Sequence, residues 1–369
     1  MKSTRREILA AAASAAAALA VRPLRADAPE KRLLILGGTR FLGPEIVDAA
    51  KKSGWKISLF NRGKSNPGLF PDLEHLPGDR NGNLKSLEGR SFDAVVDTSG
   101  YVPRQVRDTA TLLGKSARQY VFVSSISVYS NLSKPGVDEA GPVAVLEEPK
   151  VEKVDEKTYG GLKALCEKAA EAAMPGRVSN VRPGLIVGPN DGTDRYTYWP
   201  VRVARGGEVL APDKPEDPVQ LIDVRDLGAW IVRLLDTKST GVFNATSNPV
   251  KMGDLLDSCK SANGGDARFA WVDAGFLAAQ KVEEWSDLPV WTSPAGEDAG
   301  AGQVSNARAV AAGLAFRPLK TTAKDTLDWW KTLPRERTAT PKAGLTSERE
   351  AAVLAAWHEV QAKKAPKAG

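Results

Sequence analysis

The sequence contains few of the residues that build metal centres, disulfide frameworks and histidine-based catalytic sites. Its 369 residues include two cysteines, Cys166 and Cys259, and two histidines, His75 and His358. Two cysteines do not form a disulfide framework in a chain of this length, and we expect both to be buried or inert thiols. Because no Cys or His cluster is present, we predict no metal site and no histidine-based catalysis.

The chain also has little net charge outside its two ends. Its formal charge is +6, of which residues 1–28 carry +3 and residues 331–369 carry +4, so the body between them carries −1. No aromatic residues interleave with the basic residues of the tail, and nucleic-acid binding is therefore disfavoured. With 42% hydrophobic residues the chain has a globular composition, and we expect one large domain or two interleaved domains.

The first 28 residues have the pattern of an export segment. The stretch "TRREIL" (4–9) is typical of the twin-arginine route, and the Ala/Leu run that follows to Val21 is too short for a usual membrane span. Residues 26–28 form an A-x-A cleavage site, although Pro29 leaves open cleavage elsewhere or an uncleaved membrane anchor. We predict a signal peptide over 1–28 and a periplasmic location. The alternative is an alanine-rich helix of a cytoplasmic protein.

Apolar strands alternate with helical segments along the body of the chain. Short apolar runs that end in Gly, Ser or Asn predict buried strands, and the segments between them have helical periodicity. This alternation predicts an α/β fold of the Rossmann type, a doubly wound parallel sheet with a smaller C-terminal substrate-binding region. The first predicted strands are 31–38, 55–63, 91–100 and 118–130.

The same pattern predicts the domain organisation. We expect a dinucleotide-binding domain over 30–180 that also receives 216–248, and a substrate-binding region over 181–333 interleaved with it. Residues 334–369 are predicted to be a C-terminal tail with one helix, at about 347–364. The segment from about 282 to 303 is rich in Pro, Gly, Ser and Asp and predicts a long loop over a site.

A glycine-containing loop follows the first predicted strand. The stretch "GGTRFLG" lies between a strand and a helix, where backbone N–H groups and a helix N-terminus can bind a pyrophosphate. The loop predicts a dinucleotide site, although glycines can also simply end a strand. Its middle position, where glycine is usual, is occupied by Arg40. The predicted cofactor-binding residues here are Gly37, Gly38, Thr39, Arg40, Phe41, Leu42 and Gly43.

The second predicted strand ends in Asn61 and Arg62, where an acidic residue would hold the ribose of NAD. Two cations, Arg40 and Arg62, beside the adenosine ribose suit the additional phosphate of NADP. We therefore predict NADP as the cofactor, with NAD as the alternative. The other reading of the two arginines is that both are ordinary surface charges.

Tyr159 and Lys163 are spaced i and i+4 on a predicted helix, so they lie on one face of it. A nearby positive charge is expected to lower the pKa of the phenol and make it useful for proton transfer. Ser125 ends the strand "VFVSS" upstream and can polarise a substrate oxygen at the same edge of the sheet. The alternative for this serine is a hydrogen bond within its own loop.

With these motifs the chain resembles the extended and atypical branch of the short-chain dehydrogenase/reductase superfamily, the NAD-dependent epimerase/dehydratase family, over about residues 32–333. The family's strand motif selects Ser125, four residues before Tyr129, as the active-site hydroxyl, and Tyr159 and Lys163 match its Tyr-x-x-x-Lys pair. The resemblance implies that Lys163 also holds the nicotinamide ribose. It further implies cofactor contacts at Asp79, Arg80, Thr98, Ser99, Gly100, Pro183 and Gly184.

The resemblance implies an NADP-dependent epimerase/dehydratase-like oxidoreductase that acts on a hydroxylated, sugar-like substrate and holds its cofactor tightly. Because "GGTRFLG" is similar to the loop of isoflavone reductase-like proteins and of chloroplast stem-loop RNA-binding relatives, two alternatives stay open. One is an NADP-dependent reductase that exchanges its cofactor, and the other is a non-catalytic NADP- or RNA-binding protein.

Substrate contacts are expected from the segment 188–208. Tyr198, with Tyr196 and Trp199, can stack on a sugar, and Arg195, Arg202 or Arg205 can hold a phosphate or carboxylate. The alternative is that these aromatic residues belong to the core and the arginines to the surface. The predicted partners are a small-molecule substrate and the twin-arginine export machinery, while a homodimer is left open.

Overall fold

The computed structural model describes residues 30–148, 150–339 and 341–364. The predicted export segment, residues 1–28, lies outside these ranges. Within them, no helix has both the length and the apolar character needed to cross a bilayer.

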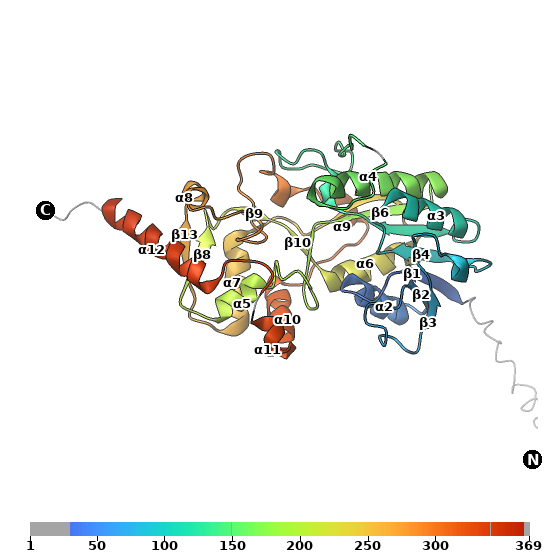
Figure 1. Ribbon diagram of the computed structural model, residues 1–369, viewed down its shortest axis with the longest axis horizontal. Helices are drawn as coiled ribbons and strands as arrows, with labels where there is room; N and C mark the ends of the chain where they lie inside the picture. Colours follow the sequence, from blue (N-terminus) through green and yellow to red (C-terminus); the bar gives the residue numbers. More distant parts are fainter. Residues whose placement is uncertain (1–29, 149, 340, 365–369) are drawn as a thin grey trace, which may run out of the picture. The chain divides into compact units, whose positions relative to one another are not determined.

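The described chain is built around one parallel sheet of seven strands, with the order β3-β2-β1-β4-β5-β6-β11 (Figure 1). This is the doubly wound arrangement that the alternation of strands and helices predicted, and the predicted α/β fold of the Rossmann type is confirmed. The strands are β1 (Lys31–Leu36), β2 (Trp55–Asn61), β3 (Glu74–Pro77), β4 (Ala94–Asp97), β5 (Gln119–Val123), β6 (Val178–Pro183) and β11 (Gly241–Ala245).

Helices cover both faces of this sheet. On one face lie α2 (Leu42–Lys52) and α6 (Val224–Thr237), and on the other α3 (Pro103–Leu113) and α4 (Glu156–Ala173) (Figure 1). The central strands β4 and β5 are buried along their whole length, which explains why they are continuous apolar runs without alternation. Both helix layers and the sheet therefore form one core region on which the loops at the strand ends are held.

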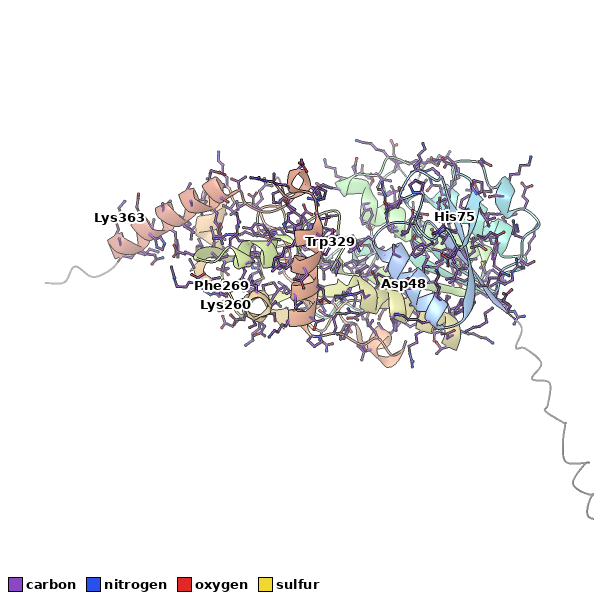
Figure 2. The ribbon with its side chains drawn as sticks, turned by 90° about the horizontal axis from the view of Figure 1, so that it is seen from below. Asp48, His75, Lys260, Phe269, Trp329 and Lys363 are labelled. Carbon is purple, nitrogen blue, oxygen red and sulfur yellow. The ribbon has the colours of Figure 1, made fainter. Side chains whose placement is uncertain are left out.

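The remaining elements of the C-terminal half surround a second core, whose largest fully buried side chains are Trp199 and Trp291. Lys260 on α7 and Phe269 on β13 mark this region in Figure 2. Its strands are β7 (Leu185–Val187), β8 (Glu208–Pro212), β9 (Pro218–Val219), β10 (Leu221–Asp223), β12 (Val250–Lys251) and β13 (Arg268–Val272). Its helices are α5 (Tyr198–Ala204), α7 (Met252–Asn263), α8 (Ala274–Ala279), α10 (Leu319–Thr332), α11 (Arg335–Thr338) and α12 (Ser347–Lys364).

The chain crosses between the two cores within residues 216–248: β9 lies with the second core, and α6 and β11 belong to the sheet core. Ala309 of α9 (Ala307–Ala311) also packs there. The described chain also forms three short 3-10 turns, η1 (Lys85–Leu87), η2 (Ile126–Val128) and η3 (Ala301–Gln303). Residues of η2 and η3 line the cleft described below, and residues of η1 do not.

Within the described residues, the helix of the expected C-terminal tail packs into the second core. Val353 and Leu354 of α12 are buried in that core, and Glu350 accepts a hydrogen bond from Nε of Arg202 at 2.5 Å. Residues on both sides of the boundary predicted at residue 333 therefore pack in the same core. The local pattern missed this because the partner of Arg202 lies 148 residues further along the chain.

Candidate active site

A cleft of about 1500 Å³ opens at the carboxyl ends of the sheet strands. It brings together most of the residues that the sequence selected, from the ends of six strands of the sheet and from α4. The predicted residues that line it are Gly37, Gly38, Thr39, Arg40, Phe41, Leu42, Asn61, Arg62, Asp79, Arg80, Thr98, Ser99, Ser125, Tyr159, Lys163, Pro183, Gly184 and Arg195. The long loop predicted at 282–303 also contributes to the lining, through Glu284, Trp285, Thr292, Asp298 and Ala301.

The glycines of the loop after β1 are required by the backbone and by close contacts. Gly37 and Gly38 have φ angles of 103° and 86°, which side chains rarely allow. A Cβ on Gly37 would lie 2.5 Å from Oγ1 of Thr98, and one on Gly43 would lie 2.4 Å from the backbone carbon of Gly38. Gly43 does not line the cleft, but it lets α2 begin directly against the loop, where its free N–H groups can meet a pyrophosphate.

The two arginines predicted to lie near the adenosine ribose of the cofactor are not paired with a carboxylate of the described residues. Arg40 and Arg62 are exposed, both line the cleft, and neither side chain forms an ion pair with any residue that the structure describes. Asn61 donates from Nδ2 to the carbonyl of Gly37 at 3.4 Å, so it ties the end of β2 to the glycine loop. The donor set at this end thus fits a dinucleotide with an additional phosphate.

Arg80 differs from the expected adenine contact. Its Nη1 donates to Asp97 at 2.6 Å and its Nη2 to Thr109 at 2.8 Å, in a buried cluster below the cleft. Asp97 also accepts from the hydroxyl of Tyr120 at 2.7 Å. The guanidinium of Arg80 is therefore engaged by the protein, and of the predicted pair Asp79 is left as the more accessible residue in the lining.

Gly100, also expected to contact the cofactor, does not line the cleft. A Cβ there would lie 2.6 Å from the ring of Phe122, and its carbonyl accepts a hydrogen bond from Lys163. A residue with a side chain therefore does not fit at position 100 without movement of its neighbours.

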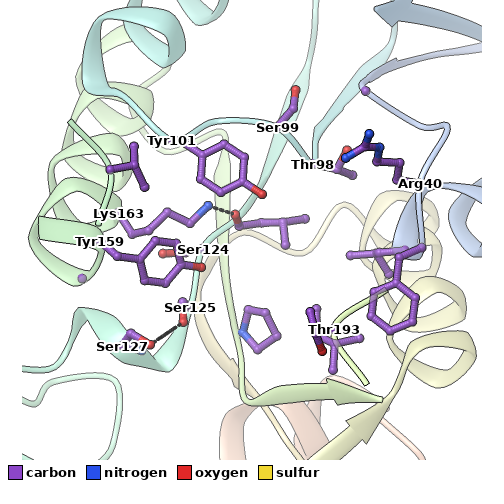
Figure 3. A pocket seen from close by; sticks show the side chains of 18 of the residues that line it. Arg40, Thr98, Ser99, Tyr101, Ser124, Ser125, Ser127, Tyr159, Lys163 and Thr193 are labelled. Carbon is purple, nitrogen blue, oxygen red and sulfur yellow. Dashed lines mark hydrogen bonds between the residues drawn. The ribbon is translucent and has the colours of Figure 1, made fainter. Parts of the chain in front are cut away.

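Tyr159 is placed by the start of α4 and by a glycine beside it. The carboxylate of Asp155 caps the helix, with Thr158 completing a capping box, so that Tyr159 lies in the first turn. A Cβ on Gly160 would lie 2.0 Å from the carbonyl of Ser127. This close approach holds α4 directly against η2 and brings the phenol next to the serines at the end of β5 (Figure 3).

The hydroxyls at the end of β5 form a short chain toward the phenol. Ser125 Oγ donates to Ser127 Oγ at 3.0 Å and accepts from the backbone N–H of Ser127 at 3.1 Å (Figure 3). The alternative expected for Ser125, a hydrogen bond within its own loop, is therefore also present. Burial raises the pKa of Tyr159, and hydrogen bonding with Ser125 acts in the opposite direction. The expectation that Lys163 lowers the pKa of this phenol is not met, since the net shift is upward and other groups cause it.

Lys163 is the most deeply buried cation of the cleft, with 3% of its surface exposed. Its Nζ donates to the carbonyls of Val123 at 2.7 Å and Gly100 at 2.9 Å, and lies over the rings of Phe122 and Tyr101. Burial lowers its pKa to about 8. An ammonium has three donors, so one remains for a ligand in the cleft.

Four further lining residues, which were not selected individually from the sequence, have side chains that can contact a ligand. Tyr101 and Trp285 are large aromatic side chains with 45% and 39% of their surface exposed. Ser124 Oγ and Asp191 Oδ2 are buried and have no hydrogen-bond partner within the described residues. Ser124 immediately precedes the predicted Ser125, and Asp191 lies in the segment expected to contact the substrate, but no sequence motif marks either residue.

Two of the three predicted substrate residues are absent from the lining. Tyr198 is buried in the second core, and Arg202 donates to Glu350 and to the carbonyls of Gly206 and Glu208. Tyr196 and Trp199 are fully buried too, so for these aromatic residues the core alternative holds. Only Arg195 remains at the cleft, where its guanidinium lies 5.6 Å from the ring centre of Trp285.

Among the described residues, no group of three His, Cys, Asp or Glu side chains is arranged to hold a metal ion. Cys166 and Cys259 are both buried and free.

Comparison with curated proteins relates the chain to one that is named for RNA binding. It is 28% identical over 254 residues to the chloroplast stem-loop binding protein of 41 kDa b from Arabidopsis thaliana, and the match covers 64% of each chain. The chain therefore spans less than two thirds of the length of this relative. No protein-family profile matches the chain.

Comparison with solved structures supports the fold. WbmG of Bordetella bronchiseptica, solved with NAD and UDP, has a TM-score of 0.62 at 15% identity, over 88% of this chain and all of that one. A human epimerase family protein solved with NADPH has a TM-score of 0.54 at 19% identity, over 80% and 99% of the two chains. UDP-glucuronic acid 4-epimerase of Bacillus cereus, solved with NAD, has a TM-score of 0.56 at 13% identity, over 81% and 96%. At these identities the similarity defines the architecture and not the reaction.

Proposed function

We propose that the protein is an NADP-dependent oxidoreductase of the epimerase/dehydratase kind, which acts on a hydroxylated substrate and keeps its cofactor bound. One observation carries the proposal. Ser125, Tyr159 and Lys163 come from β5 and α4, and they line the same cleft as the glycine loop after β1. Structural neighbours solved with NADPH or NAD support a nicotinamide dinucleotide as the ligand of such a cleft.

The residues present fit that cofactor. The cradle formed by Gly37, Gly38 and Gly43 takes the pyrophosphate at the start of α2, because any side chain there would fill the space. Arg40 and Arg62 would hold the 2′-phosphate, and the unused donor of Lys163 would hold the nicotinamide ribose. We assign NADP rather than NAD because the end of β2 offers a cation in place of a carboxylate.

The protein's own contribution to the reaction is proton transfer. A bound nicotinamide dinucleotide supplies the hydride acceptor, which can also return the hydride. Tyr159 moves the proton of the substrate hydroxyl at its phenol oxygen, and Ser125 holds that substrate oxygen by a hydrogen bond. Since burial raises the pKa of Tyr159, the phenol holds its proton near neutral pH. This protonation state suits the half-reaction in which Tyr159 gives the proton to a substrate carbonyl.

Export of the folded protein belongs to the same proposal. In epimerase or dehydratase chemistry the hydride leaves the substrate and returns to it, so one cofactor molecule can serve many turnovers without an external supply. A dinucleotide bound before export by the twin-arginine route would then suffice in the periplasm. The order of paired arginines, apolar run and A-x-A site in residues 1–28 supports this, and cell fractionation followed by immunoblotting tests it.

The proposed function is tested on the purified protein in two steps. The first identifies the nucleotide that copurifies by mass spectrometry, and we expect NADP in stoichiometric amount. The second compares wild type with Tyr159→Phe, using the absorbance of reduced nicotinamide as substrates are added. We expect the variant to bind NADP normally but to lose turnover by roughly 10²–10⁴-fold. Absence of any bound or binding dinucleotide would contradict the proposal.

A second candidate function is RNA binding, which the similarity to the chloroplast stem-loop binding protein favours. The same variant separates the two functions. If the protein acts on RNA without the phenol, Tyr159→Phe leaves RNA affinity unchanged while wild type shows no dinucleotide-dependent turnover. A gel-shift titration with a stem-loop RNA measures this directly.

A further inference from the structure

The two ends of the cleft carry opposite charge. The loops after β1, β2 and β3 contribute mainly cations, whereas α4 with its capping residue and the loops 188–197 and 282–303 together contribute more carboxylates than cations. At the first end the charged lining residues are Arg40, Arg62, Lys64, Arg80 and Asp79. At the second end the carboxylates are Asp155, Glu156, Asp191, Glu284 and Asp298, and the cations are Lys157, Lys163 and Arg195. The cofactor end is therefore positive, and the end left for the substrate is negative.

Arg195 is a partly buried cation of this acidic end. Burial lowers the pKa of Arg195 and raises the pKa of Asp191, and the attraction between the two opposite charges acts against both shifts. Nε of Arg195 donates to Oγ1 of Thr193 at 3.2 Å, and its guanidinium lies over Trp285. The sequence offered Arg202 and Arg205 as further anion-binding groups, but Arg202 is bonded to Glu350 in the second core and Arg205 is bonded to Ser347 at the surface, and neither lines the cleft.

Recognition of a diphosphate needs several unpaired cations or N–H groups aimed at the phosphate oxygens. The acidic end has the reverse composition, and Asp191, Glu284 and Asp298 form no ion pair with any described residue. An anionic group placed here would be repelled, which costs several kcal/mol for closely placed like charges. The structure thus differs in its chemistry from a site built for a nucleoside diphosphate sugar.

We propose that this end of the cleft takes a hydroxyl-rich substrate that carries no phosphate, such as a free sugar, a glycoside or a cyclic polyol. The inference rests on the proposed function and names its substrate class. Asp191 is 1% exposed; its Oδ1 accepts from Thr193, while its Oδ2 has no partner within the described residues. A carboxylate only accepts hydrogen bonds, so this oxygen is matched by a hydroxyl donor.

The aromatic and hydroxyl side chains of the cleft agree with this substrate class. Trp285 presents an exposed ring at the acidic end, against which the apolar face of a sugar can pack. Ser127, Thr193 and Thr292 line the cleft nearby and can donate to or accept from substrate hydroxyls. The structural neighbour solved with UDP shares the fold, but the proposed substrate here lacks the UDP group.

The test measures binding of UDP-glucose to the NADP-saturated protein by isothermal titration calorimetry. Three proteins are compared: wild type, a variant with Asp191→Asn, Glu284→Gln and Asp298→Asn, and a control with Glu216→Gln, Asp257→Asn and Glu359→Gln. The control makes the same change in net charge at exposed residues outside the cleft. We expect millimolar or weaker binding for wild type and control, and at least about tenfold tighter binding for the cleft variant.

Micromolar binding of UDP-glucose by wild type, or a cleft variant that binds no tighter than the control, would overturn the inference. A second arm titrates monosaccharides, methyl glycosides, disaccharides and inositols. We expect at least one to bind wild type more tightly than UDP-glucose does and to lose about tenfold in affinity in Asp191→Asn. A panel without such a ligand overturns the inference as well. Failure of the proposed function is distinguishable, because then wild type does not bind NADP in the first place.

Discussion

Among the residues of the cleft, Lys163 shows most clearly how the fold changes the properties of a single side chain. It is buried on α4, and two carbonyls accept hydrogen bonds from its ammonium. The carbonyls compensate only part of the lost hydration, so the pKa falls from 10.5 to about 8. The folded protein therefore binds a proton at this site less tightly than the unfolded chain does.

This shift predicts a dependence of stability on pH. Between about pH 8 and 10.5 the unfolded state holds more protons at Lys163 than the folded state, so this lysine's contribution to stability rises with pH. Relative to Lys163→Met, the free energy of unfolding of wild type should increase across this range by up to about 3 kcal/mol. Urea denaturation of both proteins at several pH values measures the difference. A difference that stays constant with pH, or falls, contradicts the assignment.

Arg62 allows a test of cofactor choice by a single residue. Because its exposed guanidinium has no partner among the described residues, its removal should not disturb the fold. Arg62→Ala is expected to weaken NADP binding by about tenfold or more and to leave NAD binding unchanged, since a charge-assisted bond to phosphate contributes about 1.5–3 kcal/mol. Fluorescence titration with both cofactors measures the ratio, and Lys52→Ala, exposed on α2 outside the cleft, serves as the control. Equal losses for NAD and NADP would argue against a 2′-phosphate site.

At the scale of elements, the strand-to-helix turn from β1 to α2 depends on close backbone contact. Gly43→Ala would place its Cβ 2.4 Å from backbone atoms of Gly38, so α2 must move away from the loop. We expect this variant to lose measurable NADP binding and to be destabilised by about 1–3 kcal/mol. Gly68→Ala is the matched control, because a Cβ at Gly68 meets no atom within 4 Å. Thermal unfolding with and without NADP measures both effects. A Gly43→Ala protein that binds NADP as tightly as Gly68→Ala does would show that this turn does not hold the pyrophosphate.

Local sequence patterns predicted some elements of the structure and not others. Segments such as β1 and α4 were predictable because their patterns are local: an apolar run that ends in glycine, and a Tyr-x-x-x-Lys pair on a helix. The short strand β3, with only Leu76 buried, has too little pattern to be recognised. The ion pairs of Arg80 and Arg202 were not predictable either, because Asp97 and Glu350 come close to these arginines only in the folded chain.

At the scale of the whole molecule, the chain's C-terminal helix is tied to a segment far from it in sequence. Arg202 of α5 and Glu350 of α12 form a buried ion pair, and Lys363 lies near the far end of the same helix (Figure 2). Because both partners are buried, removing one leaves an uncompensated charge in the second core.

Glu350→Ala is therefore expected to lower the free energy of unfolding by about 3–5 kcal/mol. Glu359→Ala, at an exposed position of the same helix, should change it by less than about 0.5 kcal/mol. The double variant Arg202→Met and Glu350→Leu should recover much of the loss, since no unpaired charge remains. Chemical denaturation compares the four proteins. Equal stabilities of Glu350→Ala and Glu359→Ala would mean that α12 does not belong to the second core.

The central claim is that one cleft holds a nicotinamide dinucleotide with its reactive ring beside Tyr159. A crystal structure of the protein with NADP tests this most directly. We expect the pyrophosphate on the loop 37–43, the 2′-phosphate at Arg40 and Arg62, and a substrate-sized space between the nicotinamide ring and the Tyr159 hydroxyl. A cofactor bound elsewhere, or a Tyr159 hydroxyl that points away from the ring, would contradict the account.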